Sequence, residues 1–185
     1  EYISDDTVIV ADVGQNQMFS AQFFRHNTPR HFLSSGGLGT MGFGLPAVIG
    51  AQIGCPKKLC VCITGDGGMQ MNIQEMATAV TEGTDVVVCI LNNYYLGMVR
   101  QMQQLFYGKR YSATCLRRRA TCPSNCKGPN PACPPYTPDF VKLAESYGAY
   151  GIRVEKEEDI DAAFEEAKKH KNAPTIIEFM ISTDE

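Results

Sequence analysis

The sequence lacks several features that would each point to a particular class of protein. It contains no tryptophan, and its three histidines, His26, His31 and His170, do not have the spacing of metal ligands. No apolar run approaches the roughly 20 residues that a membrane-spanning helix needs, and no signal-peptide pattern opens the chain. A net charge of −3 over 185 residues gives no electrostatic footprint for nucleic acid or an anionic membrane. We therefore expect neither of these among the partners.

The chain does contain enough apolar residues for a core of its own, at 44% of the sequence. Segments suited to buried strands alternate with segments of helical periodicity. The pattern predicts strands at 7–11, 31–35, 59–64, 85–91, 150–154 and 175–181, and helices at 15–24, 45–53, 69–83, 96–106, 139–147 and 157–171. This alternation is typical of an α/β domain in which a mostly parallel sheet of about six strands carries helices on both faces.

The boundaries of two helices carry their own signals. Asn72 followed by Glu75 is close to a capping box, which places a helix start just after the glycine turn at 65–68. Apolar residues at 73, 76, 77 and 80 then recur at helical spacing. Thr137 and Pro138 are suited to be the N-cap and the first residue of the helix at 139–147.

The most informative stretch joins two predicted strands. Gly65-Asp66-Gly67-Gly68 follows the strand 59–64, and Asn92-Asn93 closes the strand 85–91. In a parallel sheet the carboxyl ends of neighbouring strands lie at one edge, so we expect Asp66 and Asn93 to converge. Their oxygens suit Mg²⁺, which also binds phosphate oxygens and water. Gly67 and Gly68 would let backbone N–H groups approach a phosphate at a helix N-terminus. The sequence therefore predicts a Mg²⁺-bridged diphosphate.

A Gly-Asp-Gly and an Asn-Asn separated by residues 68 to 91 resemble the thiamin diphosphate (ThDP) motif of ThDP-dependent enzymes. Further matches extend over nearly the whole chain: Asp12-Val13-Gly14-Gln15, Gly36-Gly37-Leu38-Gly39-Thr40-Met41-Gly42, Leu96-Gly97-Met98-Val99-Arg100-Gln101, Leu105-Phe106-Tyr107 and Arg110-Tyr111-Ser112. This set resembles the C-terminal, diphosphate-binding domain of the large catalytic subunit of acetohydroxyacid (acetolactate) synthase. The resemblance implies the pyrophosphate domain of the thiamin diphosphate-binding fold across residues 1–185.

The resemblance also implies a set of site residues. Mg²⁺ would be held by Asp66, Asn93 and the backbone carbonyl of Tyr95. The cofactor would contact Gly14, Gln15, Asn16, Gly39, Met41, Asp66, Gly67, Gly68, Asn93, Tyr95, Leu96, Gly97 and Met98. Met41 would wedge between the two rings of ThDP. The catalytic, substrate-facing side would be formed by Met98, Val99 and Met102.

Three of these assignments have simpler alternatives that the sequence leaves open. Asn16 stands where the family commonly has a histidine; its amide can donate to a diphosphate, but it also suits a helix N-cap. The five glycines at 36, 37, 39, 42 and 44 would also suit tight helix packing. Met98 would also fit the apolar face of the helix at 96–106.

Met102 departs from the family pattern. The biosynthetic enzymes typically carry a tryptophan at this place, where it helps shape the pocket for the acceptor. A flexible methionine is expected to weaken discrimination for 2-ketobutyrate over pyruvate, because one methylene contact is worth only ~1–3 kcal/mol.

A second departure is the segment 115–138, which we interpret as an insertion. It holds four of the eight cysteines, Cys115, Cys122, Cys126 and Cys133, and six of the ten prolines. So many prolines exclude a helix or a central strand. The Cys-x6-Cys-x3-Cys-x6-Cys spacing leaves three options open: a zinc or iron–sulfur site, disulfides or redox-labile thiols, or unlinked cysteines in a packed loop. Arg117-Arg118-Arg119 would bind an anion or form a solvated charge run.

The resemblance implies a transferase that decarboxylates pyruvate and condenses the hydroxyethyl unit with a second 2-keto acid, as in branched-chain amino acid biosynthesis. The chain would be an excised domain, inactive alone, because the pyrimidine-binding domain with the family's glutamate and the FAD-binding domain are not in it. We expect a cytoplasmic homodimer or homotetramer, a pyrimidine-binding domain from the same or a partner subunit, and a small regulatory subunit. The alternatives are another ThDP-dependent 2-keto acid decarboxylase or carboligase, or a non-catalytic module with a Cys-rich metal or redox site.

Overall fold

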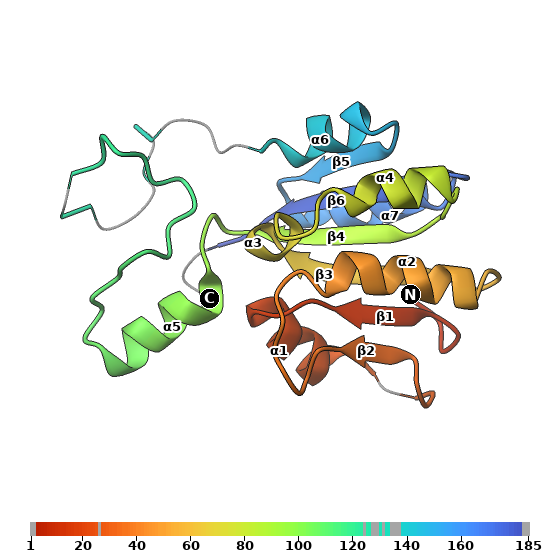
Figure 1. The fold of residues 1–185 in the computed structure, drawn as a ribbon, viewed down its shortest axis with the longest axis horizontal. Coiled ribbons are helices and arrows are strands. Elements are labelled where there is room, and N and C mark those ends of the chain that lie inside the picture. The colour runs from red at the N-terminus through yellow and green to blue at the C-terminus, as the bar shows by residue number, and fades with distance from the viewer. Residues whose placement is uncertain are drawn as a thin grey trace.

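The computed structural model describes residues 3–25, 27–123, 125–126, 130, 132–133 and 138–182. A six-stranded sheet with the strand order β2-β1-β3-β4-β6-β5 runs through this part, and every strand pair in it is parallel (Figure 1). The strands are β1 (Val8–Ala11), β2 (Phe32–Ser34), β3 (Cys60–Gly65), β4 (Val87–Asn92), β5 (Tyr150–Val154) and β6 (Thr175–Met180). The predicted parallel α/β fold is confirmed.

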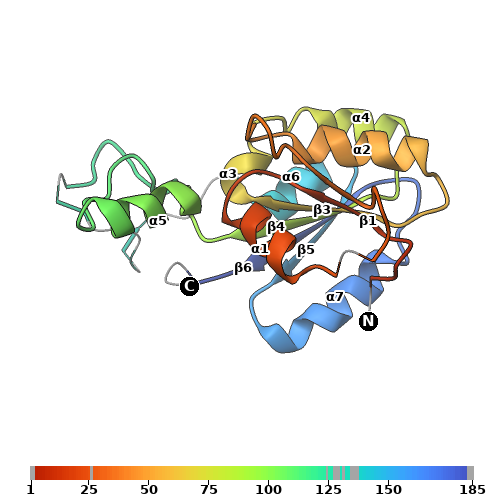
Figure 2. The ribbon, with the colours of Figure 1, turned by 90° about the horizontal axis from the view of Figure 1, so that it is seen from below.

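Helices cover both faces of the sheet, because each strand connects to the next through a crossover. They are α1 (Gln15–Phe23), α2 (Gly44–Gly54), α3 (Asp66–Met69), α4 (Glu75–Thr81), α5 (Gly97–Phe106), α6 (Phe140–Ser146) and α7 (Ile160–Ala167), with a 3₁₀ turn η1 at Glu157–Asp159. Figure 2 shows α2 and α4 above the sheet and α1 and α7 below it. No helix in the described ranges is long and apolar enough to cross a membrane.

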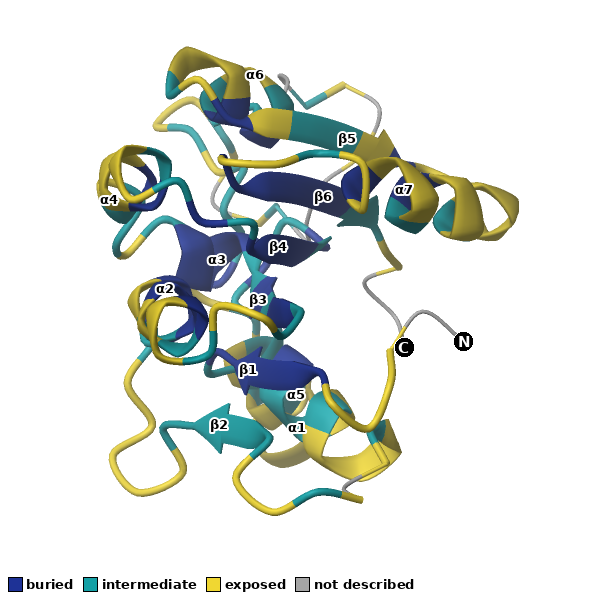
Figure 3. Ribbon diagram, turned by 90° about the vertical axis from the view of Figure 1, so that its right-hand side faces the viewer, coloured by how far each residue is buried: buried dark blue, intermediate teal, exposed yellow. Residues whose placement is uncertain are grey.

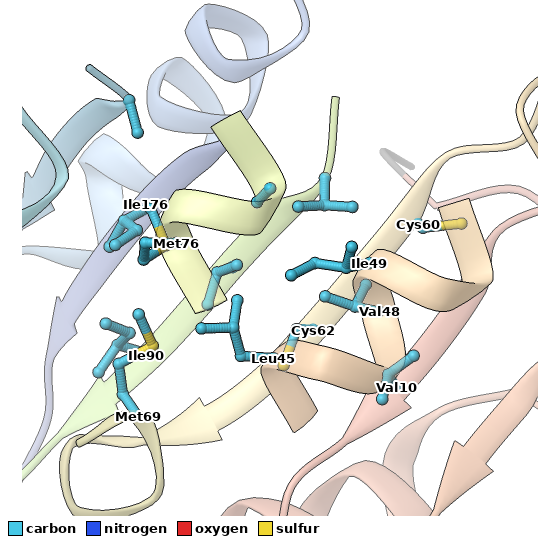
Figure 4. Close-up of a cluster of buried hydrophobic side chains, with 14 of the residues drawn as sticks. Val10, Leu45, Val48, Ile49, Cys60, Cys62, Met69, Met76, Ile90 and Ile176 are labelled. Atoms are coloured by element: carbon cyan, nitrogen blue, oxygen red, sulfur yellow. The ribbon is translucent and has the colours of Figure 1, made fainter. Parts of the chain in front are cut away.

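The core consists of two layers, one on each face, since successive residues of a strand point to opposite sides. Val10 on β1 packs with α2 and α4 in one layer, whereas its neighbour Ile9 packs in the other layer with α7. Figure 4 shows the first layer, in which Leu45 and Val48 of α2 and Met76 of α4 meet the central strands. Central strands are buried and the edge strand β2 is half-buried (Figure 3).

At the carboxyl edge of the sheet, part of the chain extends beyond the two helical layers. Helix α3 follows β3 immediately, and α5 with the coil after it extends beyond this edge in both Figure 1 and Figure 2. No residue of α5 is buried. The described parts of segment 115–138 contain neither a helix nor a strand, as the prolines predict, and make only an isolated bridge between Cys115 and Tyr95.

Several predicted helix ends were wrong. The residues of the glycine turn form the single helical turn α3, and α4 begins at Glu75, with Gln74 as its N-cap. Asn72 does not cap it, because its side chain donates instead to the Gly42 carbonyl at 2.8 Å. Ala77, one of the four apolar residues at helical spacing, is exposed, and Met76 and Ala79 are the buried residues of α4.

The later helices also differ from their predicted bounds. Asp139 is the N-cap of α6, with its carboxylate accepting hydrogen bonds from the N–H groups of Val141 and Lys142 at 3.2 and 3.3 Å. Helix α6 therefore starts at Phe140 and not at Pro138, and Thr137 lies outside the described residues. The helix predicted at 157–171 divides into η1 and α7 and ends at Ala167.

Candidate functional site

Asp66 lies at the junction of β3 and α3, where the parallel sheet ends. Only 1% of its surface is exposed, and its Oδ2 has no hydrogen-bond partner among the described residues. Burial raises the pKa of Asp66 to about 7, and the nearby charge of Glu178 also raises it. Hydrogen bonds from the backbone N–H groups of Gly67 and Tyr94 act in the opposite direction and lower it. A buried carboxylate with a free oxygen is costly unless a cation or proton compensates it. This position is therefore suited to a cation.

Asn93 reaches the same place from the adjacent strand, since Gly65 on β3 pairs with Leu91 on β4. It is buried, and its Oδ1 accepts the Tyr95 N–H at 3.0 Å. The preceding Asn92 accepts the Tyr94 N–H in the same way, also at 3.0 Å. These two turns hold Tyr94 in the left-handed region, with φ of 64°. The convergence of Asp66 and Asn93 predicted from the sequence is thus present, and Tyr95 follows directly.

The glycines at the edge are required by close packing within the protein. A Cβ on Gly68 would lie 2.9 Å from Thr64 Oγ1 and 3.0 Å from an oxygen of Asp12. One on Gly67 would lie 2.7 Å from Leu96 Cδ2, and one on Gly97 would overlap the Gln15 amide. These glycines bring three chain segments together around one space.

Asp12, at the end of β1, organises the glycine-rich loop at 36–44. Its Oδ1 accepts the N–H groups of Val13 at 2.6 Å and Gly42 at 3.0 Å, and its Oδ2 accepts Gly44 N–H at 3.3 Å and Thr64 Oγ1–H at 3.1 Å. The carboxylate therefore fixes the loop to the ends of β1 and β3. Sequence reasoning quoted the Asp12-Val13-Gly14-Gln15 motif but gave Asp12 no role; its position directly after a buried strand was the available signal.

Asn16 anchors the backbone and is not a helix N-cap. Gly14 occupies the N-cap position of α1, and Asn16 lies within the first turn. Its Nδ2 donates to the carbonyls of Asp12 at 2.9 Å and Ile63 at 3.1 Å, so both N–H bonds of the amide join β1 to β3. The cap alternative was therefore wrong, and in this structure the amide's donors are used within the protein.

These elements surround a cavity of about 190 Å³ at the carboxyl edge. All residues predicted to contact the cofactor line it: Gly14, Gln15, Asn16, Gly39, Met41, Asp66, Gly67, Gly68, Asn93, Tyr95, Leu96, Gly97 and Met98, together with Val99. Sequence reasoning missed five further lining residues: Val13, Phe19, Gly65, Leu91 and Ile181. Val13 and Gly65 precede a predicted residue, and Leu91 and Ile181 end a predicted strand, whereas Phe19 is one turn along α1 from Gln15.

Met102 is the one predicted site residue that the structure places outside this cavity. It lies on α5, one turn after Met98, with 39% of its surface exposed. Val99 borders the cavity and also a neighbouring hollow that Met102 lines with Gln103 and Phe106. Met102 is therefore adjacent to the cavity rather than part of its wall.

A parallel sheet whose carboxyl edge presents a buried carboxylate, an asparagine and close-packed glycines defines a diphosphate-binding α/β domain. The chain belongs to the family described as the C-terminal TPP-binding domain of thiamine pyrophosphate enzymes, which it matches over residues 12–179. This family is consistent with the resemblance found in the motifs.

Individual relatives are similar over nearly the full chain. A probable acetolactate synthase large subunit of Methanococcus aeolicus is 47% identical over 97% of the chain. An acetolactate synthase of Mycobacterium bovis is 45% identical over 100% of it, and an acetolactate synthase large subunit of Haemophilus influenzae is 41% identical over 96%. The chain spans only 27% to 28% of the length of these relatives.

Proposed function

We propose that the cavity binds thiamin diphosphate through a Mg²⁺ ion held by Asp66, Asn93 and the Tyr95 carbonyl. The observation that carries the proposal is Asp66: a carboxylate that is 1% exposed and has one oxygen without a described partner. Mg²⁺ takes oxygen ligands and is commonly held by one or two carboxylate-type groups together with phosphate oxygens. The donor set at this edge of the sheet has that composition.

The rest of the cavity fits the cofactor by its chemistry. The N-terminus of α1, at Gly14 and Gln15, has no side-chain cap, and its first backbone N–H groups, which lack intrahelical partners, and its partial positive charge suit a diphosphate. Met41 and Leu96 supply apolar wall, and Met41 Cε lies 3.4 Å from the site of a Cβ on Gly67. Asn16 would support the diphosphate end of the site indirectly, because its side-chain amide donates to the backbone carbonyls of Asp12 and Ile63.

Bound thiamin diphosphate supplies a nucleophilic carbon that allows the bond beside a keto group to be cleaved. The chain's own residues bind and orient this group. Asp66 and Asn93 would hold the metal at the diphosphate end of the cofactor. The loop that Asp12 anchors would place Gly39 and Met41 against the middle of the cofactor. Met98 and Val99 border the side on which the substrate would react. The chain contributes position and exclusion of water rather than a general acid or base.

We further propose that the full-length protein is an acetolactate synthase that decarboxylates pyruvate and transfers the hydroxyethyl unit to a second 2-keto acid in branched-chain amino acid biosynthesis. The support is the 41% to 47% identity to acetolactate synthases over nearly the whole chain. On this proposal the enzyme is cytoplasmic, uses FAD, assembles as a homodimer or homotetramer with a pyrimidine-binding domain at this site, and has a small regulatory subunit.

Product analysis of the full-length enzyme tests this reaction. It is supplied with pyruvate, with and without 2-ketobutyrate, together with thiamin diphosphate, Mg²⁺ and FAD. Acetolactate from pyruvate alone, joined by acetohydroxybutyrate when 2-ketobutyrate is present, is the expected result. Acetaldehyde or acetyl phosphate as the main product would contradict the synthase and favour another ThDP-dependent decarboxylase, the candidate that Met102 supports.

A further inference from the structure

The four cysteines of segment 115–138 lie around one hollow. Cys115, Cys122, Cys126 and Cys133 all line it, although up to 18 positions separate them, together with Tyr95, Tyr111, Arg117 and Arg118. The other four cysteines are elsewhere: Cys60, Cys62 and Cys89 are buried in the sheet and Cys55 follows α2. A loop that needed cysteines only as small apolar residues would have no reason to gather four of them at one point.

Backbone N–H groups point at the sulfur atoms. Arg119 N–H donates to Cys122 Sγ at 3.3 Å, and Asn130 N–H donates to Cys133 Sγ at 3.4 Å. Amide donors to sulfur stabilise thiolates, and such hydrogen bonds are the usual second layer around thiolate ligands of a metal.

The segment has no core that would hold it in shape. Between Phe106 and Phe140, the described residues include no helix, no strand and no buried apolar side chain. Short segments without a core are ordinarily fixed by disulfides or metal ions. All eight cysteines lie in the described part of the chain, and none forms a disulfide. Metal ligation remains as the cross-link that four converging thiols can supply.

We propose that Cys115, Cys122, Cys126 and Cys133 are the four thiolate ligands of a soft metal centre. Thiolates favour zinc, Cu(I) and iron–sulfur clusters among biological metals. Among the described residues, no three His, Cys, Asp or Glu side chains are already placed to hold a metal ion. The four thiols must therefore move toward one another when they bind a metal, and the test distinguishes an iron–sulfur cluster from zinc.

The centre would also stiffen the loop that carries Tyr95. Leu96 N–H donates to the Thr114 carbonyl at 2.9 Å, and Leu116 N–H donates to the Tyr94 carbonyl at 2.8 Å. Cys115, which lies between Thr114 and Leu116, forms an isolated antiparallel β-bridge with Tyr95. Fixing Cys115 in a metal centre therefore fixes the backbone that presents the Tyr95 carbonyl. This consequence for the cofactor rests on the proposed function, whereas the metal centre itself does not.

The test is metal and sulfide analysis of the full-length protein purified without oxygen, beside Cys126→Ser and the control Cys55→Ser. We expect about four irons and four sulfides per chain for a [4Fe–4S] cluster, or about one zinc for a mononuclear site. Either metal supports the thiolate centre, and the ratio identifies it. Cys126→Ser should lose most of the metal, and Cys55→Ser, which alters a cysteine outside the hollow, should keep it.

Wild-type protein keeps the proposal falsifiable if the variant does not fold. Wild type without stoichiometric metal overturns it, as does metal that Cys126→Ser retains in full. A thiol count in denaturant that rises only after reductant shows disulfides and also overturns it. If metal is present, its removal by a chelator should lower the affinity for thiamin diphosphate; unchanged affinity with the metal gone refutes only the link to Tyr95.

Discussion

The side-chain amide of Asn92 donates a 2.7 Å hydrogen bond to Oε1 of Glu178 across the interior of the sheet. Both residues are almost fully buried, and Glu178 also accepts a 2.8 Å hydrogen bond from Arg153 Nε. Because Asn92 Oδ1 in turn accepts the Tyr94 N–H, this pair sets the turn that leads to Tyr95. A carboxylate on β6 thus positions a loop that follows β4.

Replacing Glu178 with alanine should therefore destabilise the fold. The substitution leaves Asn92 and one face of Arg153 without their buried partner, which should lower the free energy of unfolding by about 3 kcal/mol. Chemical denaturation measures the loss. Glu158→Ala is the control, because its 3.8 Å ion pair with Lys156 is on the surface and should contribute less than about 0.5 kcal/mol. Equal effects of the two substitutions would contradict the role of Glu178.

Asp12→Asn should release the glycine-rich loop. The two carboxylate oxygens of Asp12 accept hydrogen bonds from N–H and O–H groups, and Asp12 is only 1% exposed. Asparagine replaces one of these oxygens with an NH₂ group, which cannot accept those hydrogen bonds. We expect a loss of about 2–3 kcal/mol in stability and faster amide hydrogen exchange confined to residues 36–44. Asp6→Asn, at an exposed position, is the control. Unchanged exchange in the loop would show that Asp12 does not anchor it.

Much of this arrangement could be predicted from sequence periodicity and local motifs. The parallel sheet, the convergence of Asp66 with Asn93 and the lining of the cavity all follow from parallel crossovers and short glycine motifs. The hydrogen bonds from Asp12 to Gly42, from Asn16 to Ile63 and from Asn92 to Glu178 could not be predicted, because each joins residues 30 to 86 positions apart in the chain. The N-cap at Asn72 failed for the same reason: its side chain is taken by a distant carbonyl, Gly42.

The raised pKa of Asp66 gives a pH dependence with a definite sign. In the folded, cation-free protein the carboxyl titrates at about 7 instead of 3.8, so the folded state holds a proton that the unfolded chain releases. Stability should then fall as pH rises from about 4 to 7 and level off above, by roughly 4 kcal/mol in total. Unfolding curves are measured in EDTA across this pH range for wild type and Asp66→Asn. The difference between their free energies of unfolding gives the pH-dependent contribution of Asp66. Parallel pH profiles would contradict the buried, raised carboxyl.

Met102→Trp tests the acceptor side in the full-length enzyme. The side chain lies beside Val99 and next to the cavity, so a larger, rigid ring should favour the larger acceptor. We expect the proportion of acetohydroxybutyrate over acetolactate to rise by about 10-fold when pyruvate and 2-ketobutyrate compete. Gln104→Trp, at an exposed position on the same helix, should leave the ratio unchanged. A ratio that Met102→Trp does not alter would remove Met102 from acceptor selection.

Calorimetric titration of the full-length apoprotein with thiamin diphosphate tests the central claim most directly. With Mg²⁺ present, wild type should bind the cofactor, and omission of the metal or the Asp66→Asn substitution should each weaken binding by 100-fold or more, equivalent to about 3 kcal/mol. The two losses should not add, because both remove the same bridge. Equal binding by wild type and Asp66→Asn in Mg²⁺ would show that Asp66 does not hold the metal, and would contradict the site proposed here.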